Sequence, residues 1–94
     1  MSTTENNSWW VYIVECSDGT YYTGSTPNVS LRIERHNLGK GAKYTRARLP
    51  VTLIFTEKQV NRSEALKREH AIKQLSRTQK KILIDQFFSQ LDQK

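Results

Sequence analysis

Hydrophobic and polar positions near the start of the chain follow the pattern of two short strands. Residues 9–16 are apolar at nearly every position, and β-branched and aromatic residues return at residues 20–25. Asp18-Gly19 stands between the two runs, and this pair tolerates the positive φ angles of a tight hairpin turn. Because the first run is apolar on both of its faces, it predicts a central strand that is covered on both sides.

The next apolar residues recur at helical spacing. Thr26-Pro27-Asn28 contains a capping residue and a proline that suits a first helical turn. Val29 and Ile33 follow at i and i+4 and define an inward face. Arg32 and His36 stand one step round from that pair, so we expect them at the border of the packed face.

Residues 37–50 show neither a helical nor a strand period. They contain two glycines, a terminal proline, four basic residues and a tyrosine. This composition predicts a long loop, and such loops are uncommon in compact domains unless they bind something or are disordered. The GKGAK sequence within it lacks the frame of a nucleotide-binding P-loop. Residues 51–57 then predict a third strand.

A second helix begins with the capping box of Asn61 and Glu64 and continues to about Ser76. Its apolar arc consists of four residues, Ala65, Leu66, Ile72 and Leu75. Glu69 falls inside this arc, where a carboxylate is costly unless it has a partner, a metal ion or a raised pKa. An ion pair with an arginine such as Arg32, or a position at the rim that reaches water, would explain Glu69 without any function.

A last helix is predicted to begin near Ser76 or Thr78. Its apolar residues repeat at i, i+3, i+4 and i+7, the spacing of a helix that packs on a sheet or on another helix, and they are Ile84, Phe87, Phe88 and Leu91. The patterns together predict an α+β domain of order ββαβαα, with a small three-stranded antiparallel sheet flanked by helices. Residues 1–8 are expected to form a disordered N-terminal tail, and residues 85–94 the end of the C-terminal helix and a tail.

Length and composition narrow the class of protein. The 94 residues suffice for one domain, and 36% hydrophobic with 26% charged residues is typical of a soluble globular protein. The sequence contains neither a membrane-spanning apolar run nor a signal peptide, so we expect a cytoplasmic protein without a membrane partner. The single cysteine, Cys16, lies in an apolar strand and is expected to be a buried structural thiol rather than a reactive one.

The net charge of +6 is unevenly distributed. Residues 1–31 carry a net charge of −3, whereas residues 32–81 carry 14 Lys and Arg against four Glu, a net charge of +10. This concentration suggests a polyanionic partner, nucleic acid before an acidic membrane surface, although basic helices can also be merely solvated. In the 37–50 loop, basic residues interleaved with a tyrosine fit phosphate contacts and a base or sugar stack. The candidate nucleic-acid-binding residues are Gly24, Lys40, Lys43, Tyr44, Arg46, Arg48 and Lys73.

Two tyrosines, a helix arginine and the anomalous glutamate occur in a recognisable order. The motifs are Trp10-Val11-Tyr12 and Tyr22-Thr23-Gly24 on the hairpin, then LRIERHN with Arg32 and His36, and EALKREHAIK with Glu69. This ordered set resembles the GIY-YIG endonuclease superfamily, and more closely its small single-domain bacterial members of the UPF0213 type, over about residues 9–84. In the first motif only the tyrosine is kept, and Trp10 stands where the family pattern has glycine.

The resemblance implies a metal-dependent endonuclease that hydrolyses phosphodiesters, with DNA favoured over RNA as the substrate and with structural or weak sequence selectivity. Glu69 would hold a divalent cation, Mg²⁺ or else Mn²⁺, and Arg32 would bind phosphate and stabilise the transition state. Either Tyr12 or His36 would orient or deprotonate the attacking water, and Tyr22 would position phosphate or metal-bound water. Because the chain has no length for a targeting domain, affinity and sequence choice would be weak or would be supplied by a protein partner.

Two other functions are compatible with the same residues. One is a nucleic-acid-binding module that keeps the fold and the basic surface but performs no chemistry. The other is a protein unrelated to nucleic acid, in which Glu69 and Arg32 form a purely structural ion pair.

Overall fold

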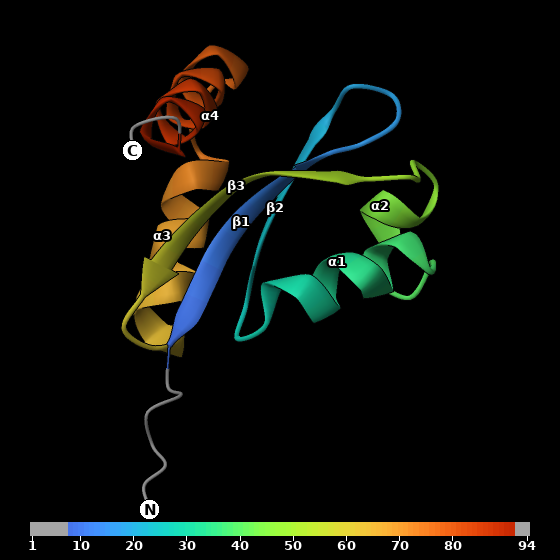
Figure 1. The fold of residues 1–94 in the computed structure, drawn as a ribbon, viewed down its shortest axis with the longest axis horizontal. Coiled ribbons are helices and arrows are strands. Elements are labelled where there is room, and N and C mark those ends of the chain that lie inside the picture. Colours follow the sequence, from blue (N-terminus) through green and yellow to red (C-terminus); the bar gives the residue numbers. More distant parts are fainter. Residues whose placement is uncertain (1–7, 92–94) are drawn as a thin grey trace, which may run out of the picture.

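The computed structural model describes residues 8–91, which form an antiparallel sheet with helices on both of its faces (Figure 1). The strand order is β2-β1-β3. The predicted α+β class and the ββαβαα order are confirmed, with an additional single-turn helix, α2, between α1 and β3. The predicted N-terminal tail, residues 1–8, lies outside the described residues except for Ser8. The elements are β1 (Trp9–Glu15), β2 (Tyr21–Thr26), α1 (Val29–Asn37), α2 (Lys43–Arg46), β3 (Thr52–Gln59), α3 (Arg62–Lys73) and α4 (Arg77–Leu91).

The central strand β1 divides the core between the two faces of the sheet. Val11 and Ile13 point to the face covered by α3 and α4, where they pack with the buried Phe55. Tyr12 and Val14 point to the opposite face, which is covered by α1 and α2. Since successive side chains alternate across a strand, the continuous apolar run supplies both cores, as its pattern predicts.

The hairpin between β1 and β2 turns at Gly19, which has a φ of +86°. Its turn is closed by Asp18, whose carboxylate accepts hydrogen bonds from the Thr20 amide at 3.1 Å and the Thr20 hydroxyl at 2.6 Å. The resulting register places Tyr12 directly opposite Gly24. The turn therefore sets the register that pairs Gly24 with Tyr12.

The helix starts differ in detail from the sequence expectations. α1 is capped by Asn28, whose side chain accepts a hydrogen bond from the Leu31 amide at 3.1 Å, so Pro27 precedes the cap instead of occupying the first turn. α3 is capped by Asn61 as predicted, but the Glu64 carboxylate pairs with Lys67 at 3.4 Å. Half of the predicted capping box is therefore present.

The expectation that α4 buries a continuous apolar stripe is wrong at its far end. Ile84 is buried and Phe87 packs against Phe55, with ring centroids 5.6 Å apart, but Phe88 and Leu91 are 45% and 54% exposed. A helix that packs on a sheet already covered by α3 can bury only a narrow stripe, which excludes residues a further step round. Leu66 on α3 is likewise 43% exposed, although the helical pattern places it in the apolar arc.

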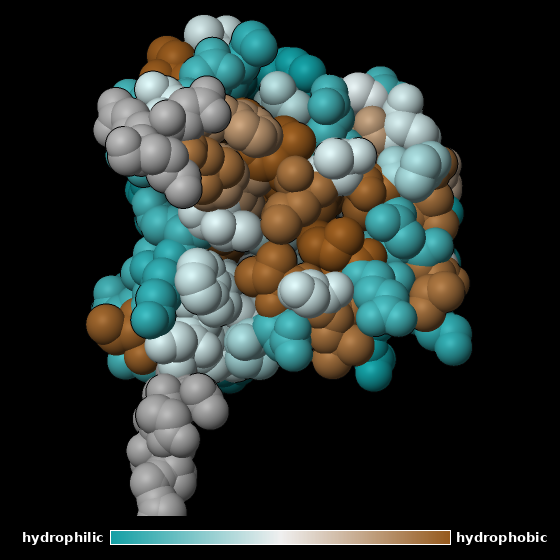
Figure 2. Space-filling model, viewed as in Figure 1, coloured by the Kyte–Doolittle hydropathy of each residue, from teal (hydrophilic) through white to brown (hydrophobic). Residues whose placement is uncertain are grey.

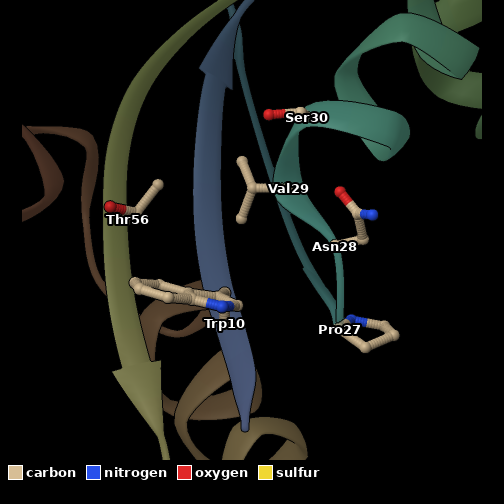
Figure 3. Close-up of a pocket in the computed structure, with 6 residues that line it drawn as sticks. All are labelled: Trp10, Pro27, Asn28, Val29, Ser30 and Thr56. Atoms are coloured by element: carbon tan, nitrogen blue, oxygen red, sulfur yellow. The ribbon is translucent and has the colours of Figure 1, made fainter. Parts of the chain in front are cut away.

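Apolar surface gathers where the sheet meets α1, as the space-filling view shows (Figure 2). A hollow of about 350 Å³ lies there, between β1, β3 and the start of α1. Trp10, Val29 and Thr56 border it from these three elements (Figure 3). Trp10 thus lines this hollow, which does not include Tyr12, Arg32 or His36. Within residues 8–91, no helix is both long and apolar enough to cross a membrane.

Candidate active site at the edge of the sheet

The hydroxyl group of Tyr12 is held between two residues of α1. It lies 2.9 Å from Nε2 of His36 and accepts a hydrogen bond from Nε of Arg32 at 3.3 Å. Arg32 and His36 are one helical turn apart, so both can face the same strand residue. The Tyr22 ring lies on the same face, with its centroid 6.4 Å from that of Tyr12. The structure thus brings together four of the five predicted catalytic residues on the α1 face of the sheet.

His36 is completely buried, so the prediction that it lies at the border of the packed face is wrong. The rings of Tyr12 and Tyr22 pack against the imidazole, and α2 covers it further, with Oγ1 of Thr45 2.8 Å from Nδ1. The sequence predicts a long loop without a helical or strand period for residues 37–50. Most of the segment is irregular as predicted, but Lys43–Arg46 form the single turn of α2, which packs on the ring through the bond between Thr45 and the imidazole.

Two glycines permit this close packing. A Cβ atom at Gly24 would lie 2.5 Å from the Tyr12 hydroxyl oxygen, and one at Gly41 would collide with the His36 ring. Ordinary van der Waals contact begins at about 3.4 Å. Gly24 therefore serves the position of Tyr12, and Gly41 serves the approach of α2 to His36.

Burial changes the proton affinities of the two ring systems in opposite directions. Desolvation raises the pKa of Tyr12 from 10.0 to about 12, although the nearby Arg32 opposes this shift. Burial also lowers the pKa of His36, and the positive charge of Arg32 lowers it further. Near neutral pH, therefore, Tyr12 keeps its proton and His36 is a neutral imidazole that can accept one.

Glu69 lies on the other face of the sheet, on α3, and its side chain is only 16% exposed. Ser25 on the edge strand β2 donates a hydrogen bond to Oε1 at 2.6 Å, and Nζ of Lys73 lies 2.7 Å from Oε2. The cation that pairs with this carboxylate is therefore Lys73. The alternative of an ion pair between Glu69 and Arg32 is wrong. Ser25 immediately follows Gly24, so β2 is what separates Glu69 from Tyr12.

The edge of β2 is lined by aromatic and basic residues. The rings of Tyr22 and Tyr44 are stacked with centroids 6.1 Å apart, and the Tyr22 ring meets the edge of His36 at 5.4 Å. A groove of about 280 Å³ runs along this edge. It is lined by Tyr21, Tyr22, Thr23, Tyr44, Lys73 and Lys80.

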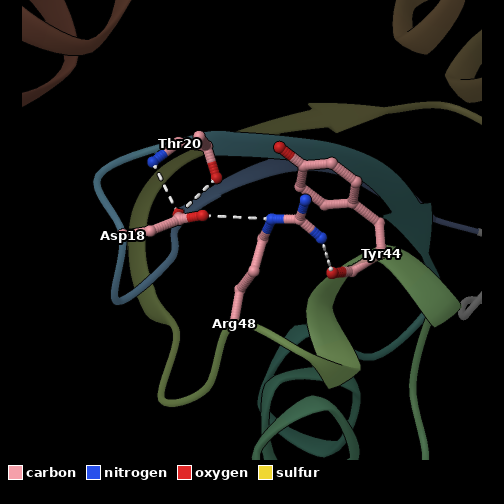
Figure 4. A network of polar contacts seen from close by, with 4 residues as sticks. All are labelled: Asp18, Thr20, Tyr44 and Arg48. Atoms are coloured by element: carbon pink, nitrogen blue, oxygen red, sulfur yellow. Dashed lines mark hydrogen bonds and ion pairs between the residues drawn. The ribbon is translucent and has the colours of Figure 1, made fainter.

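The predicted nucleic-acid-binding residues of the 37–50 segment fall into two groups. Lys40, Lys43 and Arg46 are exposed. Arg48 is instead engaged within the protein: it donates to Asp18 at 3.1 Å and to the Tyr44 carbonyl at 2.8 Å (Figure 4). Its guanidinium also covers the Tyr44 ring, 3.9 Å from the centroid. Arg48 therefore fixes Tyr44 to the hairpin turn.

The sequence analysis did not identify three polar residues of the site, which are Ser25, Thr45 and Lys80. Ser25 could have been found from strand alternation, because it faces away from Gly24 and hence toward α3. Lys80 could have been found only once α4 was known to begin beside β2. Thr45 gave no signal, because the segment that contains it has no period that would place its hydroxyl inward.

A family model covers most of the described chain. The family model described as GIY-YIG catalytic domain matches residues 8–82. The chain therefore belongs to the GIY-YIG family, a family of nucleases, and the predicted resemblance is confirmed.

The chain is similar to UPF0213 proteins and to two solved structures. A UPF0213 protein of Halobacterium salinarum is 62% identical over 73 residues, which cover 78% of this chain and 95% of the relative. The NMR structure of a UPF0213 protein from Bacillus halodurans has a TM-score of 0.54 at 46% identity and covers 83% of each chain. The NMR structure of a protein from E. faecalis has a TM-score of 0.59 at 42% identity, with 94% of this chain and 92% of that chain covered.

Proposed function

We propose that this protein is a metal-dependent endonuclease that hydrolyses phosphodiester bonds in DNA. The observation that carries the proposal is the buried contact between the Tyr12 hydroxyl and Nε2 of His36, with Arg32 bound to the same hydroxyl. A phosphodiesterase needs an attacking water, a path for its proton and a cation for the phosphate. These three residues can provide the proton path and the cation.

The proton path follows from the two shifted pKa values. A tyrosine with a pKa of about 12 is protonated at neutral pH and cannot act as a base unless its own proton leaves. In the proposed step, the attacking water gives its proton to the Tyr12 oxygen while the Tyr12 proton passes to Nε2 of His36. The alternatives of Tyr12 or His36 as the base are thereby combined into one relay.

Arg32 is suited to the phosphate because its guanidinium is always charged and has five N–H donors. The bond to Tyr12 uses Nε alone, so the terminal nitrogens can bind a phosphate oxygen in the same position. Tyr22 borders the groove beside this point and would place its hydroxyl toward the same phosphate.

The carboxylate of Glu69 fits a single divalent cation, Mg²⁺ or Mn²⁺. A carboxylate has about four lone-pair sites, and the bonds from Ser25 and Lys73 use one on each oxygen. Residues 8–91 contain no group of three or more His, Cys, Asp and Glu that could hold a metal. Mg²⁺ is commonly bound through one or two carboxylates, with water and phosphate oxygens as the other ligands. When bound, the cation would neutralise charge on the scissile phosphate.

The test is a nicking assay on supercoiled plasmid, with and without Mg²⁺ or Mn²⁺. Glu69→Gln keeps the shape of the side chain but removes its charge, and should abolish nicking. Glu64→Gln is the matched control, because this exposed residue lies on the same helix, and it should nick as the wild type does. Nicking by Glu69→Gln at the wild-type rate would contradict the proposal. A DNA and an RNA strand of equal sequence then test the preference for DNA.

A non-catalytic nucleic-acid-binding module is the second candidate function. It is favoured by the ion pair between Lys73 and Glu69, which occupies the proposed metal ligand, and by the complete burial of Tyr12. This function predicts that the wild type and Glu69→Gln bind DNA equally and that neither nicks it at any metal concentration.

A further inference from the structure

The hydrogen-bond partners of Tyr12 indicate which nitrogen of His36 carries the proton. Arg32 can only donate, so its bond uses an acceptor site on the Tyr12 oxygen. Within residues 8–91, the one acceptor in reach of the Tyr12 proton is Nε2 of His36 at 2.9 Å. Tyr12 is completely buried, and an unpaired hydroxyl proton there would be costly. Nε2 must therefore carry a lone pair.

The same count of donors and acceptors places the ring proton on Nδ1. A neutral imidazole carries one proton, so a lone pair on Nε2 places the proton on Nδ1. Nδ1 then donates to Oγ1 of Thr45 at 2.8 Å. Thr45 in turn donates its own hydroxyl proton to the carbonyl of Ala42 at 3.0 Å. Every bond from Arg32 to Ala42 thus points in one direction, with one donor and one acceptor at each step.

Thr45 is placed for this role by the fold of its segment. It lies on the single turn of α2, and its hydroxyl bonds back to the carbonyl three residues earlier, a common arrangement for threonine in a helical turn. Like His36, it is completely buried. The absence of a side chain at Gly41 lets this turn approach the ring closely.

We propose that Thr45 is a positioning residue, which holds His36 as the Nδ1–H tautomer and so keeps Nε2 ready to accept the proton of Tyr12. The proposal rests on the proposed function, because that proton transfer is part of the phosphodiester hydrolysis. In the transfer, the bond from the Tyr12 oxygen to its proton breaks and a bond from Nε2 to the proton forms. The imidazolium that results keeps its Nδ1–H bond to the Thr45 oxygen, which occupies the position that a carboxylate has in the Ser-His-Asp triad.

The first experiment measures the ring without substrate or metal. In nitrogen-15 NMR spectra of the full chain, the His36 ring of the wild type should show a protonated Nδ1 and an unprotonated Nε2. Thr45→Ser keeps the hydroxyl and should give the same pattern, whereas Thr45→Val removes it and should shift the ring toward the other tautomer. Thr26→Val is the control, because it also removes the hydroxyl of a buried threonine but makes no contact with His36. A wild-type ring with its proton on Nε2 would overturn the proposal even if Thr45→Val does not fold.

The second experiment measures nicking by the same variants at several pH values. By analogy with residues that orient metal-bound histidines, Thr45→Val should lower kcat about 10- to 100-fold. KM should stay unchanged, and Thr45→Ser should restore kcat. A wild-type kcat and pH profile in Thr45→Val would overturn the proposal, as would a Thr45→Ser variant no better than Thr45→Val. If the wild type does not nick DNA, the proposed function fails, while the NMR spectra still decide whether Thr45 sets the tautomer.

Discussion

Gly24→Ala tests whether the edge strand determines the position of Tyr12. The added Cβ would lie 2.5 Å from the hydroxyl oxygen, and ordinary contact begins at 3.4 Å, so the oxygen or the strand must move by about 0.9 Å. A shift of that size can break the 2.9 Å contact with His36. Overpacking of this kind costs about 1–3 kcal/mol, and the lost hydrogen bond adds about 1 kcal/mol. We therefore expect a loss of about 2–4 kcal/mol in the free energy of unfolding.

The assay is urea unfolding, followed by nicking under conditions in which the variant is folded. Gly39→Ala is the matched control: it has a φ of +78° and nothing within 4 Å of an added Cβ, so it introduces backbone strain alone. The control should lose about 1–2 kcal/mol of stability and keep its nicking rate. If Gly24→Ala unfolds at the wild-type urea concentration and nicks normally, the reasoning that Gly24 positions Tyr12 is refuted.

Three further predictions concern binding, pH and the carboxylate. Replacement of Lys40, Lys43 and Arg46 by glutamine should weaken DNA binding without a change in the urea concentration at half-unfolding. The slope of the logarithm of the DNA-binding constant against the logarithm of the salt concentration should fall in magnitude by about 2–3. An unchanged slope would show that these residues do not belong to the binding surface. The pKa of Tyr12 is raised from 10.0 to about 12, so the unfolded chain loses this proton first and stability should fall as pH rises from 10 to 12. Urea unfolding at each pH measures this fall, and Tyr12→Phe should lose less stability over this range than the wild type. An equal loss of stability in the two proteins would contradict a raised pKa of Tyr12. Ser25→Ala removes the hydroxyl that holds the candidate metal ligand and should raise the Mg²⁺ concentration for half-maximal nicking about 10-fold; an unchanged metal titration would show that this hydroxyl does not act on the metal.

The parts of the fold that were predictable are those whose pattern is local. The apolar run of β1, the Asp18-Gly19 turn and the Asn61 cap each satisfy their own backbone and side-chain needs within a few residues, so the sequence is sufficient to recognise them. The buried stripe on α4 was overestimated because burial depends on how much of the sheet α3 leaves free. Helical periodicity gives the direction in which Phe88 points but not the width of the surface that it meets.

The candidate site was also only partly predictable from the sequence. Tyr12, Arg32, His36 and Glu69 could be named from their order along the chain, yet the groups that determine their chemistry lie elsewhere in the sequence. Burial and the positive charge of Arg32 lower the pKa of His36. Part of that burial comes from α2, which belongs to a segment whose sequence indicates only a loop. Motif residues carry the reactive groups, and they can be recognised one by one. Their protonation states depend on contacts such as the one from Thr45 to the His36 ring, and these contacts exist only after the chain has folded.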